Sequence, residues 1–157
     1  MRTSAPAARW TWPDAWPEAR GARLALAAAS PSDLAAVRTH VSTCCACVGA
    51  DACDALTLAV DELCANVMAH GYVDARGPLT VDVEAGDPCR VTIVDAAPSF
   101  DPTGAAPPDV HVSAEARAIG GLGIFLARRS VDALRYERRG PFNVVVLDKR
   151  RAGGPRR

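Results

Sequence analysis

Lysine, long apolar runs and net charge are all scarce in this chain of 157 residues. Lys149 is the only lysine, and the pattern G-x-x-x-x-G-K-[ST] does not surround it, which excludes that phosphate-binding loop. Eighteen basic and eighteen acidic residues leave a formal net charge of zero, so nothing favours nucleic acid or an anionic membrane as a partner. No apolar stretch approaches the roughly 18 residues of a spanning helix, and the N-terminus lacks the apolar core of a secretory signal. We therefore expect a cytoplasmic protein whose partner is a small molecule or another protein.

The length fits one folded domain, large enough to bury roughly two thirds of the surface that the unfolded chain exposes. We place this domain at residues 21–150, between an N-terminal arm at residues 1–20 and a basic tail at residues 151–157. The arm holds Trp10, Trp12 and Trp16, and its prolines exclude a regular helix. Two interpretations of this extended arm stay open. Its indoles lie on the surface of the domain, or they contact a partner or a second copy in a homodimer.

Six cysteines raise the question of a disulfide framework. Five of them fall in predicted helices among Ala and Val, and nothing indicates export, so we expect reduced, small core residues. Cys44 and Cys47 have the C-x-x-C spacing of metal-binding and redox-active pairs, but the pair lies within a predicted helix and has no second pair. A metal or redox role is the less favoured alternative.

Hydrophobic periodicity predicts an α+β fold. Ser30 caps the first helix and Asp33 completes a capping box, while Asp51 and Asp54 open the second helix, which ends at Gly71. The predicted elements are a strand at 22–27, helices at 31–48 and 51–71, strands at 79–83 and 89–95, a long loop at 96–119, a helix at 124–134, and hairpin strands at 134–138 and 142–149. Because tight turns join most strands, we predict a two-layer α/β sandwich whose mixed, mostly antiparallel sheet is covered on one face by three helices.

Three polar residues interrupt an apolar helical face in "AVDELCANVMAHGY", residues 59–72. Glu62, Asn66 and His70 follow one another at four-residue steps, which places them on one side of a helix. An amide such as that of Asn66 is a suitable Mg²⁺ ligand, and Glu62 one turn earlier could accept a proton or orient a hydroxyl, with His70 near a phosphate. In the alternative, Glu62 and His70 face solvent and Asn66 bonds the backbone.

Two further features point to a ligand site. Asp95 ends an apolar strand and lies on the same face of it as Val91 and Ile93. Its carboxylate should therefore face the layer between sheet and helices, where a buried carboxylate needs a hydrogen-bond donor. The exocyclic amine of a purine could be this donor. In the alternative, the carboxylate accepts hydrogen bonds from the backbone amides of its own turn. Gly120, Gly121 and Gly123 precede a helix, where backbone N–H groups can approach an anion.

Taken in order, these stretches resemble the GHKL (Bergerat) ATP-binding family, and within it the anti-sigma-factor serine kinases. "DELCANVMAHGY" is similar to the family's N box, "VDAAPSFDP" to its first glycine box, and "EARAIGGLGIFLARRSVD", with Arg117, to its second. The resemblance covers residues 20–150. It implies a Bergerat fold that binds ATP and Mg²⁺.

The resemblance also implies a role for each matching residue. Asn66 would hold Mg²⁺, Glu62 would be the catalytic base or orienter of a substrate serine, and Asp95 would bond the adenine amine. Gly121 and Gly123 would bring backbone amides to the phosphates, and Phe100, Asp101 and Pro102 would begin the lid. The remaining expected nucleotide contacts are His70, Ala97, Arg117, Gly120 and Leu122.

One position departs from the family pattern. The family has x-Gly after the aspartate, whereas this chain has Ala96-Ala97. The extra methyl group of Ala97 would lie close to the adenine. If its surroundings did not adapt, this overpacking would weaken ATP binding by ~1 to 3 kcal/mol.

The resemblance implies an ATP-dependent serine/threonine protein kinase that sequesters a sigma factor or similar partner and phosphorylates a STAS-type antagonist. One alternative is a nucleotide-gated protein-binding module without phosphoryl transfer. The other is a scaffold that no longer binds nucleotide. We expect no direct contact with nucleic acid or membrane.

Overall fold

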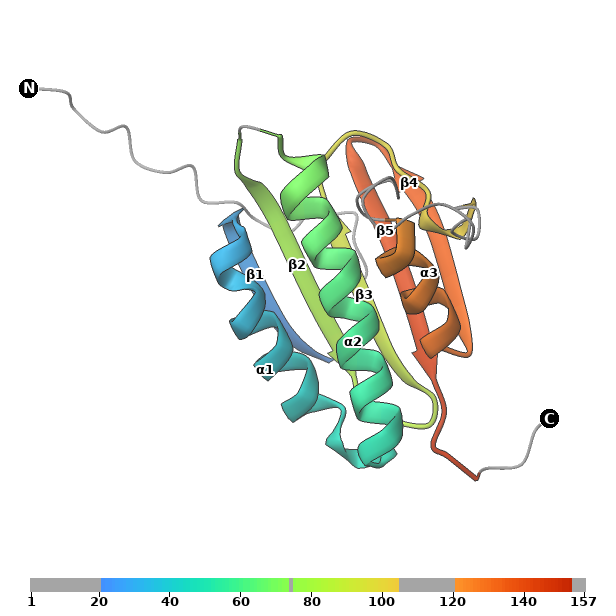
Figure 1. The fold of residues 1–157 in the computed structure, drawn as a ribbon. Coiled ribbons are helices and arrows are strands. Elements are labelled where there is room, and N and C mark those ends of the chain that lie inside the picture. Colours follow the sequence, from blue (N-terminus) through green and yellow to red (C-terminus); the bar gives the residue numbers. More distant parts are fainter. Residues whose placement is uncertain (1–20, 74, 105–120, 154–157) are drawn as a thin grey trace, which may run out of the picture.

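A computed structural model describes residues 21–73, 75–104 and 121–153, which form a five-stranded sheet in the order β1-β2-β3-β5-β4 (Figure 1). All four strand pairings are antiparallel. The strands are β1 (Ala22–Ala29), β2 (Gly77–Glu84), β3 (Cys89–Asp95), β4 (Ala133–Arg139) and β5 (Phe142–Lys149). The predicted α+β fold is confirmed, with antiparallel rather than mixed pairing among these strands.

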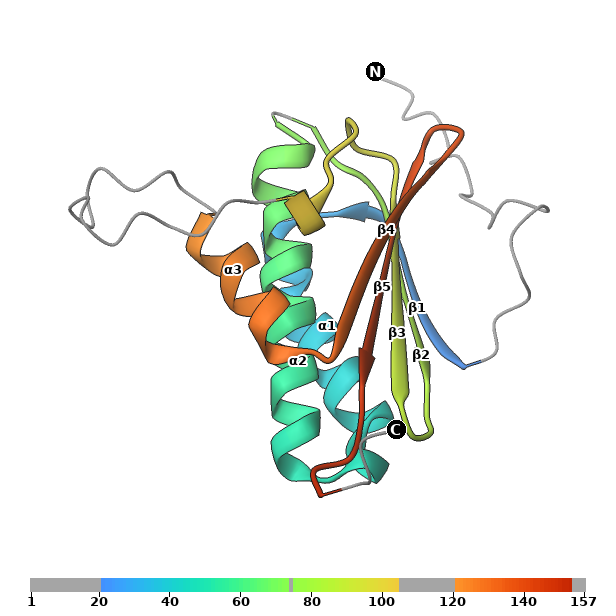
Figure 2. The same ribbon diagram turned by 90° about the vertical axis from the view of Figure 1, so that its right-hand side faces the viewer.

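Three α-helices lie on one face of this sheet (Figure 2). They are α1 (Leu34–Cys44), α2 (Ala50–Asn66) and α3 (Gly121–Ser130). The central helix, α2, buries Leu56, Val60 and Leu63 against inward-facing strand residues such as Val81 and Ile93. The predicted two-layer sandwich is therefore confirmed, and the core fills the space between the layers.

The start of the first helical segment follows the predicted capping box. The Ser30 backbone N–H and hydroxyl both donate to the Asp33 carboxylate at 2.9 Å, ahead of α1. The predicted end at residue 48 was wrong, because α1 stops at Cys44 and a short 3₁₀ turn, Ala46–Val48, follows it. The C-x-x-C pair consequently spans the end of a helix and this turn, not the middle of a helix.

The predicted cap of the second helix was also wrong. Gly49 occupies the N-cap position with a φ of 94°, so α2 begins at Ala50, and Asp51 and Asp54 lie within its first turns. A positive φ favours glycine, so the helix is capped at Gly49 and not at Asp51, two residues later. Helical structure does continue to Gly71, as expected, but its last turn, Val67–Gly71, is a π-helix.

The third helix begins and ends earlier than predicted, because α3 starts at Gly121, within the glycine stretch that was expected to precede it. It ends at Ser130, and Leu134 belongs to β4, where it pairs with Leu147 of β5. Leu134 fits the hydrophobic spacing of the preceding helix and also the alternation of the following strand, and its pairing with Leu147 makes it a strand residue. The predicted hairpin is confirmed, with Gly140 at a φ of 56° in its turn.

All six cysteines are free thiols, as expected. Cys45, Cys53, Cys64 and Cys89 are buried, whereas Cys47 is exposed. Among the described residues, no helix is long and apolar enough to cross a membrane. The arm at 1–20, most of the loop at 96–119, Arg117 and Gly120 lie outside the described residues.

Candidate functional site

A cavity of about 490 Å³ opens between the end of α2, the end of β3, the start of β5 and the start of α3. This volume lies in the range of small-molecule sites, which combine apolar walls with a few polar groups. The apolar wall consists of Leu63, Val67, Ile93, Ile124 and Val145. The polar lining consists of Asn66, His70, Asp95, Ser99 and Asn143.

The end of α2 brings two of the predicted site residues to this cavity. Asn66 is the last residue of α2, and His70 lies in the π turn that follows, closed by a 3.0 Å hydrogen bond from Tyr72 N–H to the Val67 carbonyl. Single π turns often mark functional sites. Asn66 is half-buried, and its amide forms no hydrogen bond with any described residue, so it is not held by backbone as the alternative interpretation required.

Asp95 lies at the floor of the cavity with only 2% of its surface exposed. Its Oδ1 accepts hydrogen bonds from the Ala97 N–H at 2.9 Å and from Asn143 Nδ2 at 2.8 Å. Within the described part of the chain, no donor reaches Oδ2. The turn amide thus occupies one oxygen and leaves the other for a ligand. Burial raises the pKa of Asp95, although bonds from Asn143 and Ala97 and the charge of Arg138 oppose the shift.

Asn143 was not predicted as a site residue. It stands opposite Asp95 in the β3–β5 register and also accepts from Arg138 Nη1 at 2.8 Å and from the Tyr136 hydroxyl at 2.9 Å. Arg138 further donates to the Ala97 carbonyl at 2.9 Å. The sequence could have indicated Asn143, because in the alternating pattern of this strand it lies on the same inward face as Val145 and Leu147.

Tyr72 is a second residue that the sequence did not indicate. Its hydroxyl donates to the Pro78 carbonyl at 2.6 Å and accepts from the Ala96 N–H at 2.8 Å. Burial raises the pKa of Tyr72 to about 12, so the phenol stays protonated and can make both bonds. Gly77 leaves the space that the Tyr72 ring fills. Tyr72 thereby ties the end of the helical segment to β2 and to the residue after Asp95.

The extra methyl group of Ala97 has a specific neighbour. Ala97 is buried and lines the cavity, and a Cβ added at Gly71 would lie 2.8 Å from the Ala97 Cβ. The absence of a side chain at Gly71 therefore makes room for the methyl group that departs from the family pattern.

Glu62 lies beside the cavity and does not line it. Its carboxylate occupies the space that a side chain at Gly123 would take, so it packs against the first turn of α3. Gly121 lines the cavity, whereas Leu122 is 44% exposed and is not among the lining residues.

The chain after β3 forms one edge of the cavity. Phe100 lines it although 47% of its surface is exposed, and Pro102 is buried in a short 3₁₀ turn. Asp101 Oδ1 accepts from the Thr103 N–H at 2.8 Å and from the Thr103 hydroxyl at 2.7 Å, which fixes this turn. An exposed aromatic ring at a cavity mouth offers a flat apolar surface to a ligand.

Comparison with known proteins agrees with this geometry. Residues 27–149, most of the chain, match the family model of the histidine kinase-like ATPase domain. The chain belongs to this family. It is also 30% identical over 95 residues to the serine/threonine-protein kinase BtrW of Bordetella bronchiseptica. That match covers 59% of this chain and 66% of the relative, slightly under two thirds of its length.

The residues of this ATPase domain fit a magnesium ion that arrives with a nucleotide. Mg²⁺ prefers oxygen ligands, keeps several waters and completes its shell with phosphate oxygens. Asn66 offers a side-chain oxygen at the cavity without a competing partner among described residues. No group of three His, Cys, Asp or Glu side chains in the described residues could hold a metal ion by itself. Asn66, water and phosphate would then share the coordination.

Proposed function

We propose that this protein is an ATP-dependent serine/threonine kinase of the anti-sigma-factor type, with a STAS-domain antagonist as its substrate and a sigma factor or similar regulator as its partner. The observation that carries the nucleotide part is the Asp95 carboxylate, which is buried at the cavity floor with Oδ1 satisfied and Oδ2 directed to no described donor. An adenine amine is a donor of the kind that Oδ2 requires.

Different residues of the chain would bind the adenine, the phosphates and the Mg²⁺ ion. Asp95 accepts the adenine amine, and Leu63, Ile93 and Ile124 form the apolar walls of the purine slot. Backbone N–H groups at Gly121 and Gly123 approach the phosphates at the start of α3, where the helix dipole favours negative charge. Asn66 holds Mg²⁺ through its side-chain oxygen, and His70 lies near the phosphates. Arg117, Gly120 and Leu122 are further proposed nucleotide contacts.

Phosphoryl transfer to a serine needs a group that orients the attacking hydroxyl. We assign this role to Glu62, one helical turn before Asn66, with the proton of the serine hydroxyl passing to its carboxylate. Mg²⁺ would neutralise charge on the phosphate oxygens during transfer. The similarity to a relative named a serine/threonine-protein kinase supports this assignment.

The test uses labelled ATP, Mg²⁺ and the STAS-domain proteins encoded in the same genome. We expect label on a serine or threonine of one of them, and loss of that label with Glu62→Gln. Asp61→Asn is the matched control, because Asp61 neighbours Glu62 but pairs at the surface with Arg38 at 2.8 Å. Absence of labelling with every STAS protein, despite nucleotide binding, would contradict the kinase proposal.

A nucleotide-gated binding module is the second candidate. The position of Glu62 favours it, because the carboxylate packs against Gly123 outside the cavity lining. In this case partner affinity would rise equally with ADP and ATP and would be unaffected by Glu62→Gln. A partner affinity that depends on Glu62 would exclude the module.

A further inference from the structure

Five of the six cysteines gather where α1 passes into α2, and the proposed kinase activity uses none of them. Cys44, Cys45, Cys47 and Cys53 come from this junction, and Cys89 at the start of β3 lies close enough for the charges of three of them to act on it. No group of three His, Cys, Asp or Glu side chains in the described residues could hold a metal ion, so these thiols do not form a metal site of that kind. Neighbouring thiols can also react with one another.

Cys45 and Cys53 are the pair that the fold brings into contact. Their Sγ atoms lie 2.7 Å apart. The Cys45 thiol also approaches the Cys53 carbonyl at 3.8 Å, and the Cys53 thiol donates to the Ser42 carbonyl at 3.3 Å. These contacts hold the two sulfurs against each other within the core.

The backbone fixes both members of the pair. Cys45 is the C-cap of α1, and its N–H donates to the Val41 carbonyl at 2.9 Å. Cys53 lies in the first turn of α2, and its N–H donates to the Gly49 carbonyl at 2.9 Å. Because hydrogen-bonded helix ends carry both sulfurs, their encounter needs no rearrangement of the chain, and such proximity speeds a reaction between two groups.

The two cysteines with C-x-x-C spacing, Cys44 and Cys47, have no such contact. Cys44 Sγ lies 3.9 Å from His40 Nδ1, and Cys47 is exposed. Neither forms a hydrogen bond with another thiol among the described residues. The sequence spacing therefore indicates a different pair from the one that the fold brings together.

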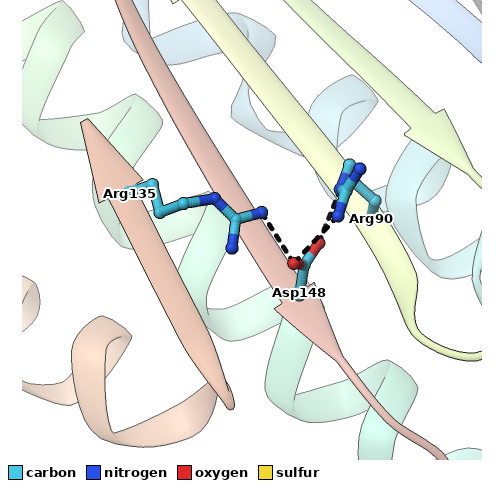
Figure 3. A network of polar contacts seen from close by, with 3 residues as sticks. All are labelled: Arg90, Arg135 and Asp148. Carbon is cyan, nitrogen blue, oxygen red and sulfur yellow. Dashed lines mark hydrogen bonds and ion pairs between the residues drawn. The ribbon is translucent and has the colours of Figure 1, made fainter. Parts of the chain in front are cut away.

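Cys89 is the fifth thiol of the cluster, and its surroundings keep it protonated. Burial raises its pKa to about 11, and the negative charges of neighbouring thiolates and of Asp148 add to this shift. The Asp148 carboxylate is held at this end of the sheet by Arg90, the residue after Cys89, and by Arg135 (Figure 3). Because the thiolate is the nucleophile, Cys89 is a poor reactant at neutral pH.

We propose that Cys45 and Cys53 are the site at which a small hydroperoxide oxidises this protein, closing a disulfide between the end of α1 and the first turn of α2. The oxidant has to be small and uncharged, because both side chains are buried. Cys53 is the thiol that meets it, since Cys53 is 6% exposed and Cys45 is 0% exposed. Burial, and then the hydrogen bond with Cys53, raise the pKa of Cys45, so Cys45 keeps its proton until the second step.

The oxidation balances with hydrogen peroxide as the only co-reactant. In the first step Cys53 loses its proton and its sulfur attacks one peroxide oxygen. An S–O bond forms and the O–O bond breaks, so one water leaves and a sulfenic acid remains. In the second step the Cys45 sulfur attacks the Cys53 sulfur. An S–S bond forms, the S–O bond breaks, and the hydroxide leaves with the Cys45 proton as a second water. The two thiols lose two electrons in total, and the peroxide gains them.

Peptide mapping tests the proposal without any substitution. Cleavage before aspartate releases Cys53 in the tripeptide Asp51-Ala52-Cys53 and Cys45 in residues 33–50. After native protein is treated with an equimolar amount of hydrogen peroxide, we expect these two peptides to be joined with the loss of two hydrogen atoms, and to be separated by dithiothreitol. A tripeptide that stays unlinked would overturn the proposal. A link that forms only in urea-unfolded protein would also overturn it, because the native packing would then not produce the bond.

Substitutions identify the partner of Cys53 within residues 33–50. Cys45→Ala should abolish the link, whereas Cys44→Ser and Cys47→Ser should retain it. Cys64→Ala should also retain it and is the matched control, because Cys64 is buried in the same helix and forms no hydrogen bond with another thiol among the described residues. A link that survives Cys45→Ala, or that disappears with Cys47→Ser, would overturn the proposal. If Cys45→Ala does not fold, fragmentation of the linked wild-type peptide locates the joined cysteine directly.

The bond should also change thermal unfolding, because a disulfide that closes residues 45–53 restricts the unfolded chain. We expect the melting temperature of the oxidised wild type to rise by roughly 5 °C and to return with dithiothreitol. An equal rise in Cys45→Ala would overturn the proposal, because oxidation elsewhere would then be its cause. No nucleotide enters these measurements, so their outcome is independent of the proposed kinase activity.

Discussion

Asn143 on β5 lies directly opposite Asp95 on β3 and donates a 2.8 Å hydrogen bond to its Oδ1. The same amide group donates to the Ala97 carbonyl at 3.1 Å, while its oxygen accepts from Arg138. Asn143 therefore fixes which carboxylate oxygen of Asp95 faces the cavity. The ligand-binding oxygen is oriented before any ligand arrives, which reduces the ordering cost of binding.

The first prediction concerns the stability of Asp95→Asn. The fold raises the pKa of Asp95 above its ordinary value of 3.8, chiefly through burial. The stabilising contribution of the protonated group is thus fully present below pH 3.8 and is lost as pH rises through the raised pKa. Because asparagine stays neutral and keeps one acceptor, we expect the variant to be as stable as the wild type, or more stable, at pH 7. Urea unfolding at pH 7 and pH 4 measures this. A variant that is less stable by more than about 1 kcal/mol at pH 7 contradicts it.

A second prediction concerns Gly71 and Ala97. Gly71→Ala should lower the free energy of unfolding by about 1 to 3 kcal/mol, because its methyl group would lie 2.8 Å from that of Ala97. Adding Ala97→Gly should restore most of this loss, giving a coupling energy of at least about 0.5 kcal/mol in a double-mutant cycle. Strictly additive effects would mean that the two methyl groups do not compete for the same space.

The charged group at the far end of the sheet gives a pH-dependent prediction. Burial alone would raise the pKa of Asp148, but hydrogen bonds from Arg90 and Arg135 outweigh it and lower the pKa below 3.8. Its stabilising contribution is therefore present above pH 3.8 and is lost as pH falls through the lowered pKa. Both arginines are partly exposed, so Asp148→Asn should cost only about 1 kcal/mol at pH 7. The difference in stability between variant and wild type should disappear once the pH falls below this lowered pKa. A difference that persists there would contradict the ion-pair origin.

Thiol labelling separates the six cysteines. Cys47 is exposed, whereas Cys45, Cys64 and Cys89 are buried, and burial raises the pKa of all three, that of Cys89 to about 11. Because the thiolate is the reactive form, we expect iodoacetamide at pH 7.5 to modify Cys47 first. Mass spectrometry of the native protein measures the order. Cys47→Ser should remove the fast step, and rapid labelling of a buried cysteine would count against the packing described above.

The fold followed from the sequence where the period was unambiguous. Leu79, Val81 and Val83 alternate and form a strand, and Ser30 with Asp33 marks a helix start correctly. The errors fall where two local rules compete. Leu134 satisfies both the helical and the strand period, and only its pairing with Leu147 makes it a strand residue. Asp51 is a good capping residue, but the turn needs the positive φ of Gly49.

The candidate site was harder to predict, because its supporting residues come from distant strands. Asp95 and Asn66 carry a local signal, since each is a polar residue in an apolar pattern. Asn143 acquires its role only when β5 pairs with β3, and Tyr72 only when it reaches Pro78 and Ala96. Such roles depend on the register between strands, which one sequence does not specify locally.

The central claim is that this cavity binds Mg-ATP through Asp95 and Asn66. Isothermal titration calorimetry at pH 7 tests it with the wild type, Asp95→Asn, Asn66→Ala and, as a control for a charge change far from the cavity, Asp148→Asn. We predict one nucleotide per chain for wild type and control, and affinity at least about tenfold weaker, or 1.4 kcal/mol, in the two site variants. Equal affinity in all four proteins, or no binding by the folded wild type, would contradict the claim.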